Sequence, residues 1–365
     1  MTIQLKNISE LYDNAVDLLK QLIEIPSLSK EESSTAEVIE EFFTAEQITS
    51  HRSGNNVWAF ANEYDKSKPT IWLNSHHDTV KPNAGYTKDP FQAIIEVGKL
   101  YGLGSNDAGG PLVSLMAAFS YFCGKELPVN LIMIASAEEE ISGQNGIASV
   151  IGQLPPCELA IVGEPTLMDA AVAEKGLMVI DAQIHGKAGH AAREEGINAI
   201  YLALEDLQTV QNFKFTRVSP FLGDTKVTAT VIHSGQQHNV VPDLCEYVLD
   251  VRVTEVYTLD EALEELKNKL KATLTPRSMR LQSSRVPEGH LILDAIQHLK
   301  LNTYGSPTLS DQALIPYPSV KVGPGDSARS HSADEYIYLE EIRDGIAGYI
   351  KLLETYFRMI TESNS

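Results

Sequence analysis

Apolar residues recur at helical spacing near both ends of the chain. Between residues 8 and 24 they lie three or four positions apart, and residues 37–43 continue the helical character. Residues 112–122 and 339–360 show the same amphipathic pattern. The spacing predicts helices over these four segments, with the last of them closing the layer formed by the others.

Short apolar runs rich in β-branched residues alternate with the helical segments. They cover residues 70–74, 129–136 and 159–162. Runs of this length with no polar alternation are typical of strands buried on both faces of a sheet. The pattern therefore predicts an α/β fold, with a mostly parallel sheet covered by helices.

The middle of the chain has a different texture, because its strand-like segments alternate apolar and polar residues as half-buried strands do. Helical stretches are expected at 198–211 and 258–274, and strands at 179–186, 226–234, 246–254 and 278–286. The order strand, helix, strand, strand, helix, strand is that of a split βαβ, ferredoxin-like unit. Residues 174–286 are therefore predicted to form an inserted α+β domain, with 1–173 and 287–365 forming one discontinuous domain.

Composition and charge exclude several partners. The 365 residues include 29 Lys and Arg against 49 Asp and Glu, for a net charge of −20. Such a chain lacks the positive surface that binding to nucleic acid or to an anionic membrane requires. The sequence has no secretory leader pattern and no apolar run approaching the roughly 20 residues of a membrane span. With three scattered cysteines, Cys123, Cys157 and Cys245, we expect a cytoplasmic protein.

Two segments near residues 76 and 107 contain candidate metal-binding side chains. His76 and Asp78 follow a predicted strand, where ligand sites form in open α/β sheets, and fit a metal ligand with its orienting carboxylate or simply a surface turn. Asp107 lies in a glycine-rich stretch, 102–112, that lacks the complete dinucleotide and P-loop motifs. It is either a helix cap or a ligand held by a tight turn.

Three further segments add acids and a second histidine. Glu138, Glu139 and Glu140 follow a buried strand, where adjacent carboxylates repel one another unless solvent or a cation relieves them. Glu164 follows the next strand, and His331 lies in a glycine-rich loop before the last helix. The joint order His-x-Asp, Asp, Glu-Glu, Glu, His supplies oxygen and imidazole ligands for two Zn²⁺-like ions and leaves one carboxylate to act as a base.

At this point the sequence resembles the M20 family of co-catalytic metallohydrolases, and within it the acetylornithine deacetylase branch. The resemblance extends over nearly the whole chain, and it implies two divalent metal ions, Zn²⁺ with Co²⁺ able to substitute. It implies that Asp78 orients the first histidine and that Glu139 is the general base, a register favoured by the following Ile141-Ser142-Gly143. The metal ligands that it implies are His76, Asp107, Glu140, Glu164 and His331.

The inserted domain carries a second set of residues that resemble the family's lid. His190 would help to stabilise the oxyanion, often in the active site of the neighbouring subunit, and Asn239 would hold substrate. Arg252 is a candidate for the substrate carboxylate, although an ion pair with Asp250 explains it equally well. The resemblance implies a homodimer formed through this lid domain.

The family resemblance implies hydrolysis of an N-acyl amino acid, most closely as an acetylornithine deacetylase in arginine biosynthesis. A desuccinylase of N-succinyl-ornithine, -citrulline or -diaminopimelate, or a di-metal exopeptidase, would share the same metal ligands. A third possibility is a catalytically inactive homologue that uses the lid for dimerisation or binding. The segment Ala108-Gly109-Gly110 departs from the family, which often has a lysine there.

Overall fold

The computed structural model describes residues 7–363 and divides the chain into two compact units. The first unit comprises Met1–Val172, Arg285–Tyr304 and Ser310–Ser365, and the second comprises Ala173–Ser284 and Gly305–Leu309. The main segment of the second unit thus lies within two residues of the inserted domain expected at 174–286. Residues 305–309, which also belong to this unit, lie outside the expected bounds.

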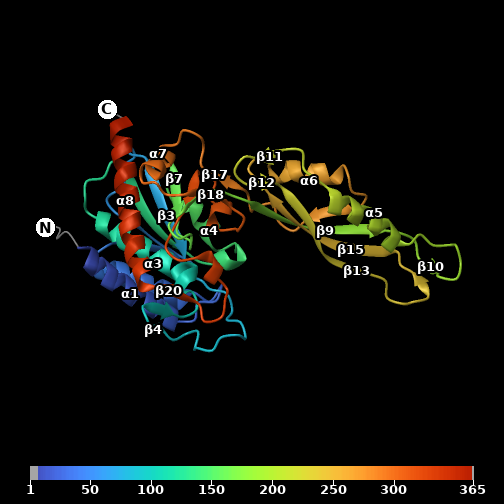
Figure 1. Ribbon diagram of the computed structural model, residues 1–365, viewed down its shortest axis with the longest axis horizontal. Helices are drawn as coiled ribbons and strands as arrows, with labels where there is room; N and C mark the ends of the chain where they lie inside the picture. The colour runs from blue at the N-terminus through green and yellow to red at the C-terminus, as the bar shows by residue number, and fades with distance from the viewer. Residues whose placement is uncertain (1–6, 364–365) are drawn as a thin grey trace. The chain divides into compact units, whose positions relative to one another are not determined.

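The first unit is built on one nine-stranded sheet (Figure 1). Its strands are β1 (Ser50–Ser53), β2 (Asn56–Phe60), β3 (Thr70–His76), β6 (Asn130–Ser136), β7 (Leu159–Val162), β8 (Ala170–Glu174), β17 (Ser284–Arg285), β18 (Thr303–Ser306) and β19 (Ser319–Lys321). They lie in the order β1-β2-β6-β3-β7-β19-β8-β17, with β18 beside β8. The central strands β6, β3, β7 and β19 are parallel, whereas β1, β2 and β8 pair antiparallel with their neighbours.

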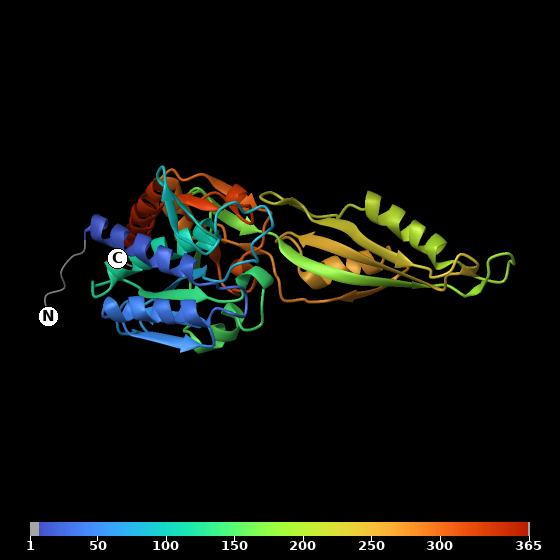
Figure 2. The same ribbon diagram turned by 90° about the horizontal axis from the view of Figure 1, so that it is seen from below.

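Two apolar layers cover this sheet. Along β3 the side chains of Ile71 and Leu73 join the core formed with the helices of one face, whereas Trp72 packs on the opposite face. The helices of this unit are α1 (Ile8–Glu24), α2 (Ser33–Ala45), α3 (Gly110–Phe122), α4 (Ile147–Val150), α7 (Leu291–His298) and α8 (Leu339–Ser363). Of these, α4 packs on the same face as Trp72. Helices α1, α3 and α8 pack against one another and lie together in both views (Figures 1 and 2). Burial on both faces explains why the central strands contain adjacent apolar residues and no regular polar alternation.

These elements confirm the α/β fold predicted for this part of the chain. The predicted helix at 37–43 begins four residues earlier, at Ser33, and the last helix extends to Ser363. Among residues 7–363, no helix combines the length and apolar character needed to cross a bilayer.

Short elements complete the first unit. Strands β4 (Ile94–Glu96), β5 (Lys99–Tyr101) and β20 (Tyr336–Tyr338) form a small antiparallel sheet. The remaining elements are single turns: η1 (Ser105–Gly109), η2 (Glu139–Ile141), η3 (Ile151–Gln153), η4 (Asp311–Ala313) and η5 (Ser327–Arg329). Two of these turns, η1 and η2, carry predicted site residues.

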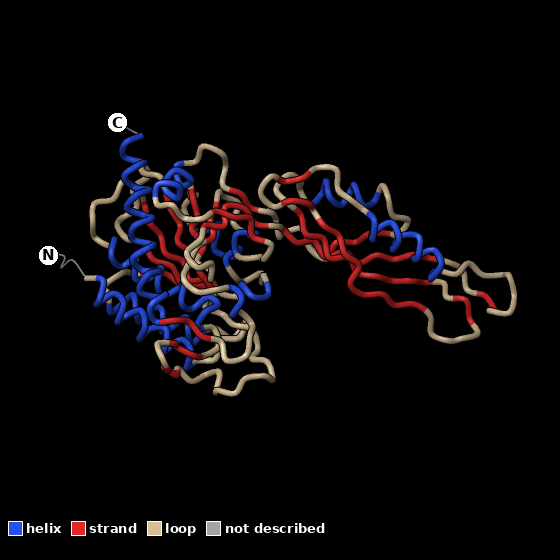
Figure 3. Tube along the Cα trace, in the orientation of Figure 1, coloured by secondary structure: helices blue, strands red, loops and turns tan. Residues whose placement is uncertain are grey.

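The second unit is a four-stranded antiparallel sheet with two helices packed on one face (Figure 3). Its main elements in chain order are β9 (Gly176–His185), α5 (Ala199–Asn212), β13 (Lys226–Ser234), β15 (Leu244–Val253), α6 (Leu259–Lys267) and β16 (Thr273–Pro276). The spatial order β13-β15-β9-β16 is the ferredoxin-like arrangement. Two minor ladders join β10 (Gly189–His190) to β14 (Val240–Val241) and β11 (Val218–Ser219) to β12 (Gly223–Asp224).

Two predicted elements of the second unit are wrong in extent. The helix expected over 258–274 ends at Lys267, and the alternately exposed and buried residues of β16 form the fourth strand instead. The strand expected over 278–286 is reduced to β17, because local hydrogen bonds replace the ladder. The Arg280 N–H donates to Ser278 Oγ, and the Gln282 side chain donates to the Met279 carbonyl.

Candidate metal centre

The carboxyl ends of three neighbouring parallel strands bring distant side chains together. His76 is the last residue of β3, Glu139 and Glu140 follow β6, and Glu164 lies two residues beyond β7. Asp107 is presented by the turn η1, immediately before α3. Sites in open α/β sheets form at this edge because the strand ends and the loops that follow them meet there.

Two overlapping groups of possible ligands result from this convergence. His76 Nε2 lies 3.3 Å from Asp107 Oδ1, 3.7 Å from Glu139 Oε2 and 3.8 Å from Glu164 Oε1. The ligand atoms of His76, Glu139 and Glu164, and those of His76, Asp107 and Glu140, all lie within 4.8 Å of one another in each group.

His331 completes the second group from the far end of the chain. Its Nε2 lies 3.0 Å from Glu140 Oε2 and 3.7 Å from Asp107 Oδ2. Every residue predicted as a metal ligand therefore lies in one cluster.

The chemistry of this cluster fits divalent cations. The His76 side chain is 1% exposed, and its Nδ1 lies 3.0 Å from the Asp78 carbonyl oxygen, which fixes that nitrogen as the protonated one. Its Nε2 is buried, has no hydrogen-bond partner and faces the surrounding carboxylates. An unpaired buried polar atom needs an explanation, and a metal ion bound to imidazole and carboxylate provides one.

Electrostatics leads to the same conclusion. Burial, reinforced by Asp107 and Glu140, raises the pKa of Glu164 to about 8. Burial, with Glu164 and other neighbouring carboxylates, also raises the pKa of Glu139 well above its usual value. Burial alone would lower the pKa of His76, but Glu139 and Asp107 raise it well above the usual value. The raised pKa values of Glu164, Glu139 and His76 all indicate an excess of negative charge that a bound cation would relieve.

Asp78 holds both halves of the cluster. Its Oδ2 accepts hydrogen bonds from Ser29 Oγ at 2.7 Å and from the Glu140 N–H at 3.2 Å. Its Oδ1 accepts from the Glu139 N–H at 3.0 Å and lies 3.4 Å from His76 Nδ1. This carboxylate therefore lies against the histidine and also fixes the turn that carries the two glutamates.

The three adjacent glutamates point in different directions. Glu138 takes a left-handed backbone conformation with φ of 54°, and its carboxylate accepts hydrogen bonds from the N–H and side-chain amide of Asn145. It therefore faces away from His76, whereas Glu139 and Glu140 face the cluster. This geometry favours the assignment of base and ligand to Glu139 and Glu140 over an assignment of the same roles to Glu138 and Glu139.

Sequence reasoning missed two buried acids beside the cluster. The Glu335 carboxylate accepts backbone hydrogen bonds from Gly104, Asn106 and Asp107. Asp311 accepts a hydrogen bond from Ser136 Oγ at 2.5 Å, directly under the end of β6. Glu335 could have been noticed from its place four residues after His331, whereas Asp311 gives no signal in the sequence.

In the second unit, two of the three predicted substrate residues lie together. The β10–β14 ladder pairs His190 with Val240, and the Ala191 N–H donates to the Asn239 carbonyl at 3.0 Å. Arg252 lies towards the other end of β15 and pairs with Asp250 through two hydrogen bonds of 2.9 and 3.1 Å. The structure thus contains the ion pair expected as the alternative for Arg252.

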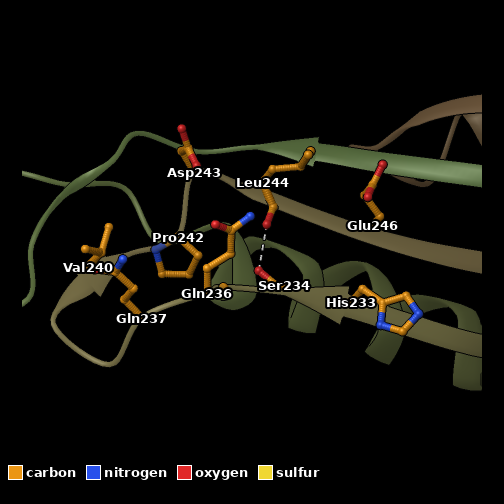
Figure 4. Close-up of a pocket in the computed structure, with 10 residues that line it drawn as sticks. His233, Ser234, Gln236, Gln237, Val240, Pro242, Asp243, Leu244 and Glu246 are labelled. Atoms are coloured by element: carbon orange, nitrogen blue, oxygen red, sulfur yellow. Dashed lines mark hydrogen bonds between the residues drawn. The ribbon is translucent and has the colours of Figure 1, made fainter.

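A hollow of about 420 Å³ lies beside the β10–β14 ladder (Figure 4). Val240 and Pro242 border it on one side, and His233 and Glu246 on the other. Ser234 Oγ is held by the Leu244 carbonyl at 2.6 Å. Val240, which lines the hollow, follows Asn239 in the sequence. Both groups of possible metal ligands found among the described residues belong to the first unit.

Comparison with known proteins supports this interpretation. The sequence profile of peptidase family M20/M25/M40 matches residues 72–355. Acetylornithine deacetylase of Pectobacterium carotovorum is 29% identical over 296 residues, covering 74% of this chain and 76% of that protein. A peptidase M20 domain-containing protein of Schizosaccharomyces pombe is 27% identical over 356 residues, covering 93% of this chain and 84% of that protein.

Solved structures share the fold. Aminopeptidase PepT of Bacillus cereus superposes with a TM-score of 0.76 at 18% identity, covering 94% of this chain and 98% of that one. A dinuclear metal-binding peptidase of the M20 family from Bacillus subtilis gives a TM-score of 0.75 at 17% identity, covering 96% and 99%. With the profile match and the cluster of metal-ligating side chains, the chain belongs to peptidase family M20/M25/M40 and is a metal-binding hydrolase.

Proposed function

We propose that this hydrolase removes the acyl group from an N-acyl amino acid, with N-acetylornithine in arginine biosynthesis as its substrate. The observation that carries the proposal is the pair of overlapping groups of possible ligands, His76 with Glu139 and Glu164 and His76 with Asp107 and Glu140. The relatives named acetylornithine deacetylase support the choice of substrate class.

The residues fit two divalent ions, and we propose Zn²⁺, with Co²⁺ able to substitute. His76, Asp107 and Glu164 would hold the first ion, and Asp107, Glu140 and His331 the second. Such ions, when bound, lower the pKa of a coordinated water and polarise the scissile carbonyl.

Glu139 is proposed as the general base. Its carboxylate is held at the centre of the cluster, because Asp78 binds its backbone N–H at 3.0 Å. A carboxylate so placed takes the proton of the attacking water and returns it to the leaving amine. The result is a free amino acid and a carboxylic acid.

The second unit supplies the proposed substrate contacts. His190 would stabilise the oxyanion and Asn239 would bind substrate, in agreement with the hydrogen bond between the neighbouring Ala191 N–H and the Asn239 carbonyl. Arg252 would bind the substrate carboxylate only by exchanging its pairing with Asp250. Arg252→Lys should raise KM if this exchange occurs, because a lysine cannot form the bidentate pair with a carboxylate, and should leave KM unchanged if the ion pair is purely structural.

A homodimer through the second unit is proposed as the working form, in the cytoplasm. Strand β13 is an edge strand, and its Val231 and Ile232 are 41% and 50% exposed. On the adjacent helix α5, Tyr201 and Leu204 are 68% and 53% exposed. An unpaired edge beside exposed apolar side chains is suited to a second copy of the chain.

Amine release from a panel of acylated amino acids tests the proposed activity. The panel should contain N-acetyl- and N-succinyl-ornithine, -citrulline and -diaminopimelate, with dipeptides for the exopeptidase alternative, each with Zn²⁺ or Co²⁺. We expect the highest kcat/KM with N-acetylornithine. Preference for the succinyl compounds or for dipeptides would replace the proposed substrate by that class, and no turnover on any would reject the proposal.

Metal analysis separates the enzyme from an inactive homologue that serves only as a dimeric binding protein. Close to two ions per chain are expected after dialysis against buffer. A chain that retains no metal and hydrolyses none of these substrates would support the inactive homologue.

A further inference from the structure

One buried carboxylate binds the backbone of the turn that presents Asp107. Glu335 Oε1 accepts from the N–H groups of Asn106 and Asp107, both at 2.9 Å, and its Oε2 accepts from Gly104 at 3.2 Å. The Glu335 carbonyl also accepts from the Gly102 N–H at 3.0 Å. Glu335 is 1% exposed, so these bonds are formed away from competing water.

The turn has little freedom to move on its own. Gly104 is left-handed, with φ of 75°, and a Cβ there would lie 2.5 Å from Thr79 Cγ2. A Cβ on Gly110 would overlap the Ile337 side chain, two residues beyond Glu335. The side chain of Asn106 exchanges two hydrogen bonds of 3.0 Å with the backbone of Asp326. The position of Asp107 is therefore determined by the segment that contains Glu335.

That same segment carries His331. Three residues separate His331 from Glu335, and both Asp107 and His331 belong to the proposed second metal position. Asp334, the residue before Glu335, binds the N–H groups of Thr87 and Lys88 at 2.8 and 2.9 Å. The segment is thus fixed on both sides, by Asp334 to one loop and by Glu335 to the turn η1.

We propose that Glu335 is a positioning residue that sets the place of the Asp107 carboxylate relative to His331 and so tunes the second metal position. It touches neither substrate nor metal and acts through the backbone of Asp107. The inference rests on the metal centre of the proposed function. Groups that orient metal ligands in this way typically change metal affinity or activity by about 10- to 100-fold when they are replaced.

The test compares Glu335→Gln with Asp206→Asn. Asp206 is a matched control in the second unit, because it is 2% exposed and its carboxylate binds the N–H groups of Lys271 and Ala272 and the hydroxyl of Tyr247. Each substitution replaces a buried carboxyl group by an amide and turns its NH₂ towards donors. Both variants should lose stability to urea, but only one alters the turn that presents Asp107.

Zn²⁺ titration calorimetry of metal-free protein gives the decisive measurement. For Glu335→Gln we expect the weaker of the two Zn²⁺ equivalents to bind about 10- to 100-fold less tightly, with kcat reduced and KM little changed. Asp206→Asn should bind both equivalents as the wild type does. Wild-type affinity for both equivalents in Glu335→Gln would overturn the inference.

A second variant and a second readout keep the two proposals apart. If Glu335→Gln fails to fold, Glu335→Asp is tested by the same measurements. This variant retains a carboxyl group but shortens the side chain by one methylene. The visible absorption of bound Co²⁺ should change in Glu335→Gln and remain unchanged in Asp206→Asn. A wild type that binds two ions but hydrolyses no acylated amino acid would reject the proposed activity and leave this inference standing.

Discussion

Gly143 is the position where one methyl group should disable the site without touching a ligand. A Cβ at Gly143 would overlap the Cβ and Oε2 of Glu138 and lie 2.8 Å from its Cδ. Carbon atoms pack at about 3.5–4.0 Å, so Glu138 would have to move by about 1 Å. Its side chain cannot simply swing aside, because Asn145 holds the carboxylate with two hydrogen bonds.

A displacement of Glu138 would also move the turn η2, which begins at the next residue and carries Glu139 and Glu140. Glu138 is bonded to Glu139 and precedes Glu140, and the Gly143 N–H itself donates to the Glu138 carbonyl at 2.8 Å. A misplacement of about 1 Å can cost about 100-fold in rate, and overpacking a buried position costs about 1–3 kcal/mol of stability. We therefore expect Gly143→Ala to lower kcat about 100-fold and to weaken metal binding.

Gly152→Ala is the matched control, because a Cβ there would meet nothing within 4 Å and the glycine is not left-handed. Both variants should be assayed for kcat and KM on the best acylated substrate, for metal content, and for urea unfolding. Gly152→Ala should behave as the wild type. Wild-type kcat and two bound ions in Gly143→Ala would refute the argument that the position of Glu138 determines that of Glu139 and Glu140.

Three further predictions test other parts of the molecule. Glu139→Gln should lower kcat by about 10²- to 10⁴-fold while two ions stay bound, since the residue is proposed as a base; loss of an ion would show it to be a ligand. Ile232→Lys should shift sedimentation from dimer to monomer, whereas Lys226→Arg on the same strand should not; a dimer that survives excludes the β13 edge as the interface. Burial lowers the pKa of His290, so the folded protein binds fewer protons than the unfolded chain below about pH 6.5, and acidification should cost stability. His290→Asn keeps an acceptor for the Ile292 N–H, so its urea midpoint should fall less than that of the wild type between pH 7.5 and 5.5; equal falls would contradict this assignment.

The parts of the fold that the sequence predicts are those stabilised by local patterning. Strands β3, β6 and β7 contain runs of adjacent apolar residues because both faces of the sheet are buried, and such runs are visible in the sequence. Strands β5 and β20 have three residues each and pair across more than two hundred positions. Their existence depends on long-range contacts rather than on any local preference, so no periodicity reveals them.

The candidate site divides in the same way. His76, Glu140 and Glu164 were predictable because each follows a strand whose end faces the same edge of the sheet. The place of Glu335 after His331 marks it in the sequence, but its role was not predictable, since its partners are backbone N–H groups that any residue could supply. Asp311 was not predictable either, because its partner Ser136 is an ordinary strand residue 175 positions away.

Adjacent acids in this protein differ in role because the backbone turns between them. Glu138 is left-handed and binds Asn145, whereas the next two glutamates face His76, with their N–H groups on Asp78. Asp334, also left-handed, binds a surface loop, whereas Glu335 is buried against the Asp107 turn. Composition alone therefore does not predict which acid in a run of like charges faces the cluster. The direction of each carboxylate depends on the φ angle of one residue in the run, and the hydrogen bonds of neighbouring residues stabilise that conformation.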